Sequence, residues 1–373
     1  MRRFSILLAC AVIAAAVSPV LAAGYRTSVG SGGDEIPVVV VSGTPYEMGY
    51  SYGKLMAKEI KAGMEAYLAA AKAEEPERCA DATLDAAWAT VEPYVHARFL
   101  EEMRGVADGS GVSYELLRRA HSVPLVSDYA CSGVAVWGPA SANGHLYQIR
   151  NLDYTMDAGL QDYPVIVVYL PKTGIAHANI AFAGFVGSIA GLNAEGIALT
   201  EKGATPGSDY PFNLKGAHFM TFFRDILQDA SSLDQALGIV RSAQRIKKYY
   251  YVVGDGDQPA GVKIRAFAPN LDIWGGNDPT DEIAPNVMRN VVYVTMDDDQ
   301  AWKHLQANYG KYDPKLMVEL SRLVGTDGGL MYVVYDATAR EMWVSYAEGN
   351  TPTQNREYVH FKLDDYLRRP PKE

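Results

Sequence analysis

Residues 128–154, DYACSGVAVWGPASANGHLYQIRNLDY, predict a β-hairpin. The stretches 131–138 and 145–150 are rich in the apolar and aromatic residues that favour strands. The loop between them ends in Asn143-Gly144, a dipeptide that accepts the positive φ angles required in a tight hairpin turn. We therefore expect two paired antiparallel strands.

Three chemically useful side chains stand on this hairpin. Cys131 begins its first strand, and Arg150 and Asp153 follow at the end of the second. Pairing of the strands brings a thiol, a cation and a carboxylate together, and these are groups from which a cysteine nucleophile site is built.

The chain before the hairpin predicts helices, and the chain after it predicts many short strands. Residues 44–47 (TPYE) have the form of a capping box, a helix over residues 81–106 is expected to bend at Pro93, and Ser113 is expected to cap a short helix through Arg119. Helices and strands in separate runs indicate the α+β class rather than alternating βαβ units.

The amino terminus predicts export. Residues 1–23 combine two arginines, an apolar run and a small-residue end, which is the pattern of a secretory signal peptide. Residues 7–10 (LLAC) resemble a lipoprotein box, but they fall at the start of the apolar run, so we favour a signal peptide. We expect a periplasmic or secreted protein.

Composition limits the partners and cofactors. The net charge is −10 and no basic stripe is present, which argues against nucleic acid as a partner. No segment after residue 23 has the length and apolarity of a membrane helix. The sequence has no zinc-ligand spacing, P-loop or dinucleotide fingerprint, so we expect neither a metal nor an organic cofactor. Nothing in it sets the oligomeric state.

Cys79 and Cys131 remain once the signal peptide is removed. Two cysteines in an exported chain could form one disulfide. A chain of this length buries a core large enough to need no such link, so we favour two separate thiols.

A cysteine nucleophile acts as its thiolate, whose free pKa is about 8.5, and therefore needs a base or a nearby cation. None of the seven histidines lies in a recognisable cysteine-protease context, and His145 is the nearest one in the hairpin. An α-amine is the alternative base. Attack of the Cys131 thiol on the carbonyl of Ala130, with cleavage of that bond, would place such an amine on the nucleophile itself.

The residues around this cysteine resemble a known superfamily. Residues 131–133 (CSG), 144–147 (GHLY) and 150–154 (RNLDY) are similar to the N-terminal nucleophile (Ntn) hydrolases. The similarity is greatest to the branches of acid ceramidase, N-acylethanolamine acid amidase, choloylglycine hydrolase and the acyl-coenzyme A:6-aminopenicillanic acid acyltransferases. Residues 43–49 and 107–112 also resemble the acyltransferase branch.

The resemblance implies a role for three residues of the hairpin. Cys131 would cleave the chain and then accept the acyl group, Arg150 would lower the pKa of its thiol, and Asp153 would bond the new α-amine. Residues three positions apart point to opposite faces of a regular strand. The strand must therefore end or bend at residues 151–152 if Arg150 and Asp153 both face Cys131. An exposed ion pair without a catalytic role is the alternative.

The resemblance suggests several candidates for the oxyanion donors but does not assign them. Glu201 stands where relatives carry a polar residue after the second strand pair, and its carboxylate would orient the new amine or a water. Asn193 is a candidate substrate or oxyanion residue, although it also has the position of a turn residue. Tyr250 is a further candidate, because relatives often have asparagine where this chain has the three successive tyrosines 249–251. Tyr154, which follows Asp153, is another candidate.

The implied fold is a four-layer αββα sandwich of two stacked antiparallel sheets. Residues 24–130 would form a mainly helical part that is cleaved from residues 131–373, and together they would complete one Ntn domain. The implied activity is hydrolysis or acyl transfer at a non-peptide amide bond of a small N-acyl compound. Three alternatives stay open: a Cys-His hydrolase that does not cleave itself, an exported binding protein without catalysis, and a protein of the same fold that has lost its activity.

Overall fold

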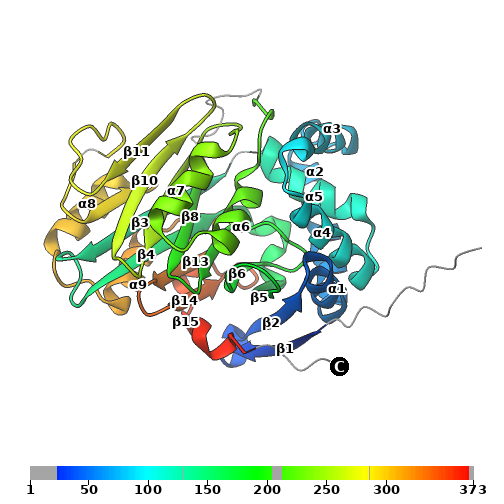
Figure 1. Ribbon diagram of the computed structural model, residues 1–373, viewed down its shortest axis with the longest axis horizontal. Coiled ribbons are helices and arrows are strands. Elements are labelled where there is room, and N and C mark those ends of the chain that lie inside the picture. The colour runs from blue at the N-terminus through cyan, green and yellow to red at the C-terminus, as the bar shows by residue number, and fades with distance from the viewer. Residues whose placement is uncertain (1–22, 128, 204–211, 285, 369–373) are drawn as a thin grey trace, which may run out of the picture.

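Two β-sheets stacked face to face form the centre of the molecule (Figure 1). The computed structural model describes four stretches of the chain, residues 23–127, 129–203, 212–284 and 286–368. The predicted signal peptide and lipoprotein-like box lie outside the described residues, apart from residue 23. None of the helices within these stretches combines the length and the apolar composition of a membrane span.

Nine strands form the first sheet, and all neighbouring pairs are antiparallel except β2 with β5. In spatial order the strands are β1 (Ala23–Val29), β2 (Ile36–Gly43), β5 (Pro164–Pro171), β6 (His177–Phe182), β7 (Ala190–Asn193), β8 (Ile197–Gly203), β9 (Tyr249–Asp255), β10 (Ala260–Ala266) and β11 (Leu271–Gly275).

Six antiparallel strands form the second sheet, and the predicted hairpin lies at its centre as β3 and β4. In spatial order the strands are β12 (Val291–Val294), β3 (Ala130–Gly138), β4 (Gly144–Asp153), β13 (Gly329–Asp336), β14 (Glu341–Tyr346) and β15 (Val359–Lys362).

The sheets approach each other closely beside the hairpin. Gln148 of β4 donates to the hydroxyl of Thr200 on β8 at 2.9 Å. A Cβ atom built on Gly133 of β3 would lie 2.7 Å from Thr200 Cγ2. Because any larger side chain at Gly133 would collide there, glycine lets the two sheets meet at this point.

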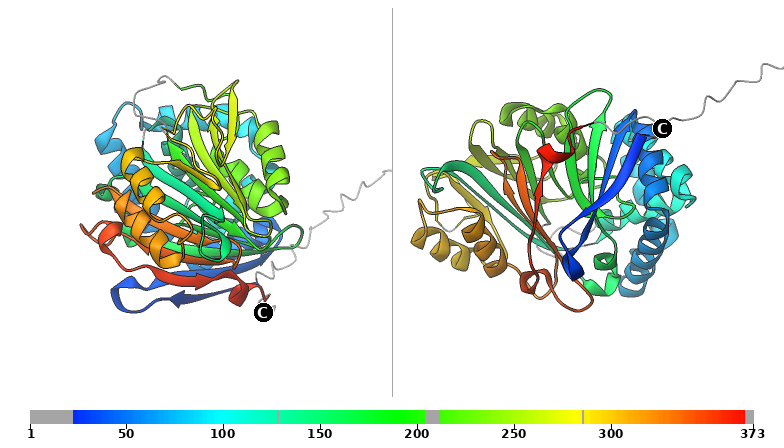
Figure 2. Two further views of the ribbon diagram at one scale, coloured as in Figure 1. Left: turned by 90° about the vertical axis from the view of Figure 1, so that its left-hand side faces the viewer. Right: turned by 90° about the horizontal axis from the view of Figure 1, so that it is seen from below.

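Helices cover the outer face of each sheet, so the layers follow the order αββα and the predicted fold class is confirmed. In the left view of Figure 2, α8 and α9 lie on one side of the sheets and α7 on the other. The nine-stranded sheet carries α1 (Pro45–Leu55), α6 (Phe219–Asp229) and α7 (Leu233–Ser242), with α2 (Ala57–Glu74), α3 (Asp81–Val91), α4 (Ala97–Ser110) and α5 (Tyr114–Val126) packed beside α1; the six-stranded sheet carries α8 (Asp298–Ala307) and α9 (Pro314–Leu323).

Helix boundaries confirm one prediction and correct two. Thr44 and Glu47 form the predicted capping box. The single bent helix predicted over residues 81–106 is instead two helices, because the chain near Pro93 forms a 3₁₀ turn and α4 begins only at residue 97. The helix capped by Ser113 continues beyond residue 119 to residue 126, since its apolar positions keep packing into the core along that length.

Candidate functional site

Cys131 is the second residue of β3, and its side chain is fully buried. Cys79 and Cys131 are both free thiols, so the alternative of a disulfide between them is wrong. The Sγ atom of Cys131 lies 3.9 Å from Oε2 of Glu201, and the positive charge of Arg150 lowers the pKa of this thiol. The thiol thus lies near one cation and one carboxyl group.

Strand register places Arg150 beside this thiol. Arg150 lies opposite Gly133, and Leu152 lies opposite Cys131, so the side chains of Cys131, Arg150 and Leu152 project from the same face of the sheet. The guanidinium is fully buried, and its Nη2 donates to Glu201 Oε2 at 3.2 Å. Its other nitrogens donate to backbone carbonyl oxygens, at 2.9 Å to that of Ile189 and at 2.6 Å to that of Asn151.

Glu201 reaches the thiol from the other sheet, on β8. Its Oε1 accepts a hydrogen bond of 3.1 Å from the hydroxyl of Tyr129, two residues before Cys131. Burial raises the pKa of Glu201 to about 7, although the charge of Arg150 and the bond from Tyr129 oppose this rise. This carboxyl group therefore changes its charge near neutral pH.

The thiol is protonated in the intact chain. Burial raises the pKa of Cys131 to about 12, the positive charge of Arg150 lowers it, and the charges of Glu201 and Asp153 raise it further. Arg150 therefore acts in the predicted direction, but desolvation has the larger effect. The thiol becomes a nucleophile only where a neighbouring base takes its proton.

Asp153 faces away from Arg150, because the strand neither ends nor bends at residues 151–152, which was the condition for both side chains to face Cys131. β4 continues through Asp153, so a three-residue offset leaves the two side chains on opposite faces. Asp153 Oδ1 accepts bonds from the hydroxyls of Thr326 (2.9 Å) and Tyr332 (2.6 Å). Burial raises the pKa of Asp153, while these bonds oppose the rise.

Asp153 nevertheless lies next to the predicted cleavage site, because its register partner is Ala130. Its second oxygen, Oδ2, is buried and has no hydrogen-bond partner among the described residues. A buried carboxylate oxygen without a partner is costly, so this atom offers an unused acceptor beside residues 130 and 131.

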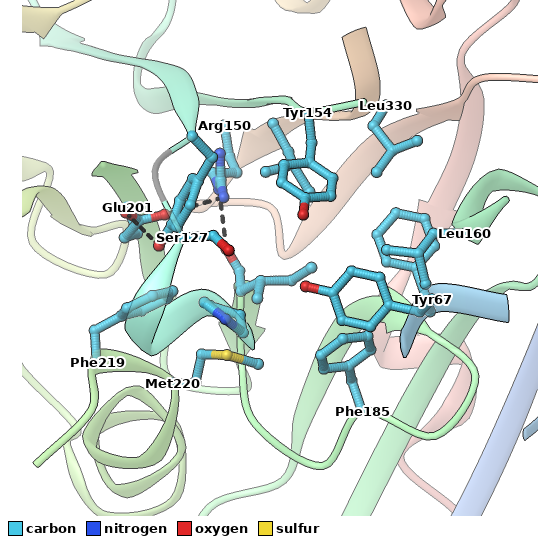
Figure 3. Close-up of a pocket in the computed structure, with 15 residues that line it drawn as sticks. Tyr67, Ser127, Arg150, Tyr154, Leu160, Phe185, Glu201, Phe219, Met220 and Leu330 are labelled. Atoms are coloured by element: carbon cyan, nitrogen blue, oxygen red, sulfur yellow. Dashed lines mark hydrogen bonds and ion pairs between the residues drawn. The ribbon is translucent and has the colours of Figure 1, made fainter. Parts of the chain in front are cut away.

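A cavity of about 50 Å³ begins at Arg150 and Glu201 and extends between the sheets and the helices (Figure 3). Ser127 and Tyr129, from the segment that leads into Cys131, form part of its wall. Apart from these polar groups, its lining is mostly aromatic and apolar and includes Tyr67, Tyr154, Leu160, Phe182, Phe185, Phe219, Met220 and Leu330.

Three of the remaining predictions concern oxyanion or substrate contacts. Tyr154 lines the cavity. Asn193 does not: its amide donates to the carbonyls of Leu227 and Ala230 and its oxygen accepts from the turn after β7, so it is the turn residue. Tyr250 is also absent from the lining and lies near the ammonium groups of two lysines. The oxyanion role of Asn193 and Tyr250 is therefore not supported.

Sequence reasoning missed three residues of this site. Tyr67 on α2 has the helical spacing of an ordinary core residue, and that spacing conceals its place in the cavity. Tyr129 could have been found from its position two residues before Cys131. Lys247, which donates to the carbonyl oxygen of Ser127 at 2.6 Å, lies 120 positions away and leaves no signal in the sequence.

Among the described residues, no histidine shifts the pKa of the Cys131 thiol, and no group of side chains is arranged to bind a metal ion. The charged groups that shift the pKa of Cys131 are Arg150, Glu201 and Asp153, and no histidine is among them. The described residues also contain no cluster of three histidine, cysteine or carboxylate side chains arranged to hold a metal ion.

Comparison with known proteins identifies relatives over much of the chain. Residues 140–272 match the family described as acyl-coenzyme A:6-aminopenicillanic acid acyl-transferase. Protein dcd1B of Dictyostelium discoideum is 24% identical over 360 residues, which cover 88% of this chain and 71% of that protein. The N-acylethanolamine-hydrolyzing acid amidase of Oryctolagus cuniculus is 28% identical over 185 residues, covering 47% of this chain and 50% of the amidase.

Two solved structures are also similar. The Caenorhabditis elegans ortholog of N-acylethanolamine-hydrolyzing acid amidase has a TM-score of 0.45 and 17% identity, covering 56% of this chain and 93% of that one. A variant of conjugated bile acid hydrolase from Clostridium perfringens has a TM-score of 0.43 and 9% identity, covering 65% and 97%.

The family match begins at residue 140, after Cys131, and covers β4 and the strands from β5 to β10, which include Arg150 and Glu201. The amidase relatives and the αββα layering agree with that match. The chain is therefore similar to the amide hydrolases and acyltransferases of the N-terminal nucleophile hydrolase superfamily.

Proposed function

We propose that this protein is an exported cysteine amidase or acyltransferase that activates itself by cleaving the Ala130–Cys131 bond. Its substrate is a small N-acyl compound with a non-peptide amide bond, and Cys131 is the nucleophile. The observation that carries the proposal is the position of the Cys131 thiol beside Arg150 and Glu201, at the end of an apolar cavity.

Self-cleavage starts from the intact chain. Glu201, whose Oε2 lies 3.9 Å from the sulfur, takes the thiol proton, and Sγ attacks the carbonyl carbon of Ala130. The C–N bond breaks as the C–S bond forms, and the nitrogen of Cys131 takes up the proton and becomes an amine. Water then hydrolyses the thioester, which leaves a carboxylate on Ala130 and a free thiol on Cys131.

The segment before this bond is held from three directions. Ser127 donates to Glu75 Oε2 at 2.8 Å, its carbonyl oxygen accepts from Lys247, and Tyr129 donates to Glu201. These contacts limit the motion of the chain that carries the carbonyl under attack, and they favour a productive geometry. Because Ser127 and Tyr129 also wall the cavity, release of this segment would widen access to the thiol.

Catalysis on the substrate then uses the new amine. An α-amine has a pKa of about 7.7–8.0, so it can take the proton of the thiol on its own residue. The partnerless Oδ2 of Asp153 is suited to accept a hydrogen bond from that amine. The thiolate attacks the amide carbon, the leaving amine takes the proton from the ammonium, and water or an acceptor amine removes the acyl group from sulfur.

Two further features support the substrate class and the location. The names of the amidase relatives specify hydrolysis of N-acylethanolamines, which are small N-acyl compounds. Residues 1–23 have the pattern of a secretory signal peptide, and this pattern supports export.

Intact mass and amino-terminal sequencing of the purified protein test the proposal. We expect two chains that meet at residues 130 and 131, with Cys131 as the first residue of the second. Cys131→Ala is expected to leave the chain uncut and to lower amidase activity more than about 1,000-fold. Cys79→Ala removes the other buried thiol and is expected to cleave normally.

A folded wild-type chain that stays uncut yet hydrolyses amides would overturn self-cleavage and favour the Cys-His alternative. An uncut chain without activity, unaffected by Cys131→Ala, would favour the binding protein.

A further inference from the structure

The two carboxylate oxygens of Asp153 have unequal surroundings. Its Oδ1 accepts from the hydroxyl of Tyr332 at 2.6 Å, from the hydroxyl of Thr326 at 2.9 Å and from the backbone N–H of Thr326 at 3.2 Å. Its Oδ2 is buried and has no hydrogen-bond partner among the described residues. Because Oδ1 already has three donors, the carboxylate cannot turn without breaking these bonds, and Oδ2 is the atom left to receive a new donor.

The hydroxyl of Tyr332 lies where the backbone leaves room for it. Tyr332 belongs to β13 and is fully buried. A Cβ atom built on Gly325 or on Gly329 would lie 2.4 Å from its Oη, so a side chain at either position would displace the hydroxyl. This oxygen also accepts from the N–H of Thr326 at 3.0 Å, and its own proton is donated to Asp153. The turn and the tyrosine therefore fix the carboxylate together.

The turn that carries Thr326 follows α9, and this part of the chain bonds the back of the hairpin at two further points. Ser321 exchanges two hydrogen bonds with Asn151, at 2.7 and 2.8 Å. Ser132 donates to the carbonyl oxygen of Val324 at 3.3 Å. These contacts lie on the face of the hairpin opposite the thiol, because side chains alternate along each strand. All of these residues follow the cleavage site in the chain, so cleavage does not detach them from the nucleophile.

On the basis of the proposed function, we propose that Tyr332 and Thr326 are positioning residues that act through Asp153. They hold its carboxylate so that Oδ2 receives the α-amine that cleavage creates on Cys131. Without them the carboxylate can turn, and the amine loses the partner that directs it toward the thiol. The intact chain has no α-amine at Cys131, so this role exists only after cleavage.

The same hydrogen bonds favour the charged form of Asp153. Burial raises the pKa of this carboxyl group, whereas the bonds from Tyr332 and Thr326 lower it. An ionised carboxylate binds an ammonium group more strongly than a neutral carboxyl group does. The two residues therefore support the charge of Asp153 as well as its direction.

The two reactions of the protein distinguish positioning from a purely structural role. In Tyr332→Phe we expect self-cleavage near the wild-type rate, since that step needs no amine. We expect kcat on p-nitroanilides of short and long straight-chain carboxylic acids to fall about tenfold with KM unchanged, because one hydrogen bond to a charged group is lost. Tyr293→Phe is the matched control and keeps both rates: Tyr293 is also buried, donates to the carbonyl of Asn286 and accepts from the N–H of that residue.

Thr326 provides a second comparison, which holds even where Tyr332→Phe fails to fold. Thr326→Val replaces the hydroxyl by a methyl group and is expected to lower kcat about fivefold. Thr326→Ser keeps the hydroxyl and is expected to retain the wild-type kcat. The extent of self-cleavage, measured by mass spectrometry, reports whether each variant folds.

A double-mutant cycle tests whether Tyr332 acts through Asp153. Asp153→Asn is expected to lower kcat about 100-fold. Adding Tyr332→Phe to this variant is expected to lower kcat no further, since the carboxylate that Tyr332 holds is already absent. Losses that multiply in the double variant would overturn the inference.

Other outcomes separate this inference from the proposed function. Equal slowing of self-cleavage and hydrolysis in Tyr332→Phe would show a structural role and overturn the inference, as would a wild-type kcat in both Tyr332→Phe and Thr326→Val. A folded wild-type protein that hydrolyses none of the p-nitroanilides overturns the proposed function instead.

Discussion

The chain buries two arginine–glutamate pairs, and their bonds are distributed differently. Arg224 on α6 holds Glu102 on α4 with two parallel hydrogen bonds of 2.9 Å each, and its guanidinium lies 3.9 Å from the ring centroid of Tyr169. Arg150 and Glu201 share a single bond of 3.2 Å and use their remaining atoms elsewhere.

We call the first pair closed and the second pair open. In the closed pair both carboxylate oxygens are taken by the same arginine, so its effect is to hold two helices together. In the open pair, Arg150 and Glu201 both also lie near the thiol of Cys131, and Glu201 accepts from Tyr129. Burial alone therefore does not distinguish structural from reactive ion pairs. Arg224 also donates to the carbonyl oxygen of Val186 at 2.6 Å, so the two pairs differ instead in that the open pair lies beside a thiol.

Conservative replacement of each arginine tests this distinction with the largest expected effect. Arg150→Lys keeps a charge but loses the fork that reaches Glu201 and two carbonyls, so self-cleavage and kcat/KM are expected to fall at least about 100-fold. Arg224→Lys is expected to lower the free energy of unfolding by about 1–3 kcal/mol and to spare activity per folded molecule. Mass analysis, amide hydrolysis and urea denaturation measure these effects. Equal losses of activity in both variants would break the comparison.

The glutamates are expected to differ in the pH dependence of stability. Burial raises the pKa of Glu201 to about 7 from an ordinary value of 4.5, so the folded chain holds a proton that the unfolded chain releases. The contribution of Glu201 to the free energy of unfolding is complete at acidic pH and is lost as pH rises through 7. Urea denaturation of the uncut Cys131→Ala protein should show the free energy of unfolding falling between pH 5 and 8, and Glu201→Gln should remove that part of the fall.

Glu102→Gln is the matched control for this experiment. It leaves Arg224 charged and buried with a neutral partner, so it is expected to lower the free energy of unfolding by about 3–5 kcal/mol while the fall through pH 7 persists. Loss of that fall in Glu102→Gln, or its persistence in Glu201→Gln, would assign the titration to another group.

Lys247 extends the comparison to the segment before the Ala130–Cys131 bond, which lies next to the open pair. Lys247→Met removes the bond to the carbonyl of Ser127, and we expect self-cleavage to slow about tenfold because the segment is held less firmly. Lys263→Met is the control, since Lys263 is buried and pairs with Asp281 away from this segment. A time course of cleavage by mass spectrometry distinguishes them, and equal slowing would argue against positioning by Lys247.

The smallest expected effect concerns the contact of the two sheets that brings the open pair together. Gly133→Ala places a methyl group 2.7 Å from Thr200 Cγ2 and is expected to cost about 1–3 kcal/mol in stability. Gly238→Ala, at an exposed position of α7 with no atom within 4 Å, is expected to raise stability by about 0.5–1 kcal/mol. Thermal denaturation of both variants measures these changes. A stable Gly133→Ala protein would show that the sheets can separate without loss.

The local sequence pattern was sufficient to predict the hairpin. Alternating strand residues and Asn143-Gly144 placed β3 and β4, and the register then follows, with Arg150 near Cys131. The same period of two residues also required Asp153 to face away from Arg150, and β4 keeps that period to its end. Both side chains would have faced the thiol only if the strand had ended or bent at residues 151–152, and β4 does neither.

The sequence by itself determined the hairpin, its nucleophile and the α+β class, because strand period, turn residues and helix caps act over a few neighbouring residues. Only the tertiary structure decided that Glu201 meets Cys131 from the opposite sheet, that Lys247 holds Ser127, and that Tyr332 bonds Asp153. Those contacts join residues 70, 120 and 179 positions apart, and they depend on how sheets and helices pack rather than on any local preference.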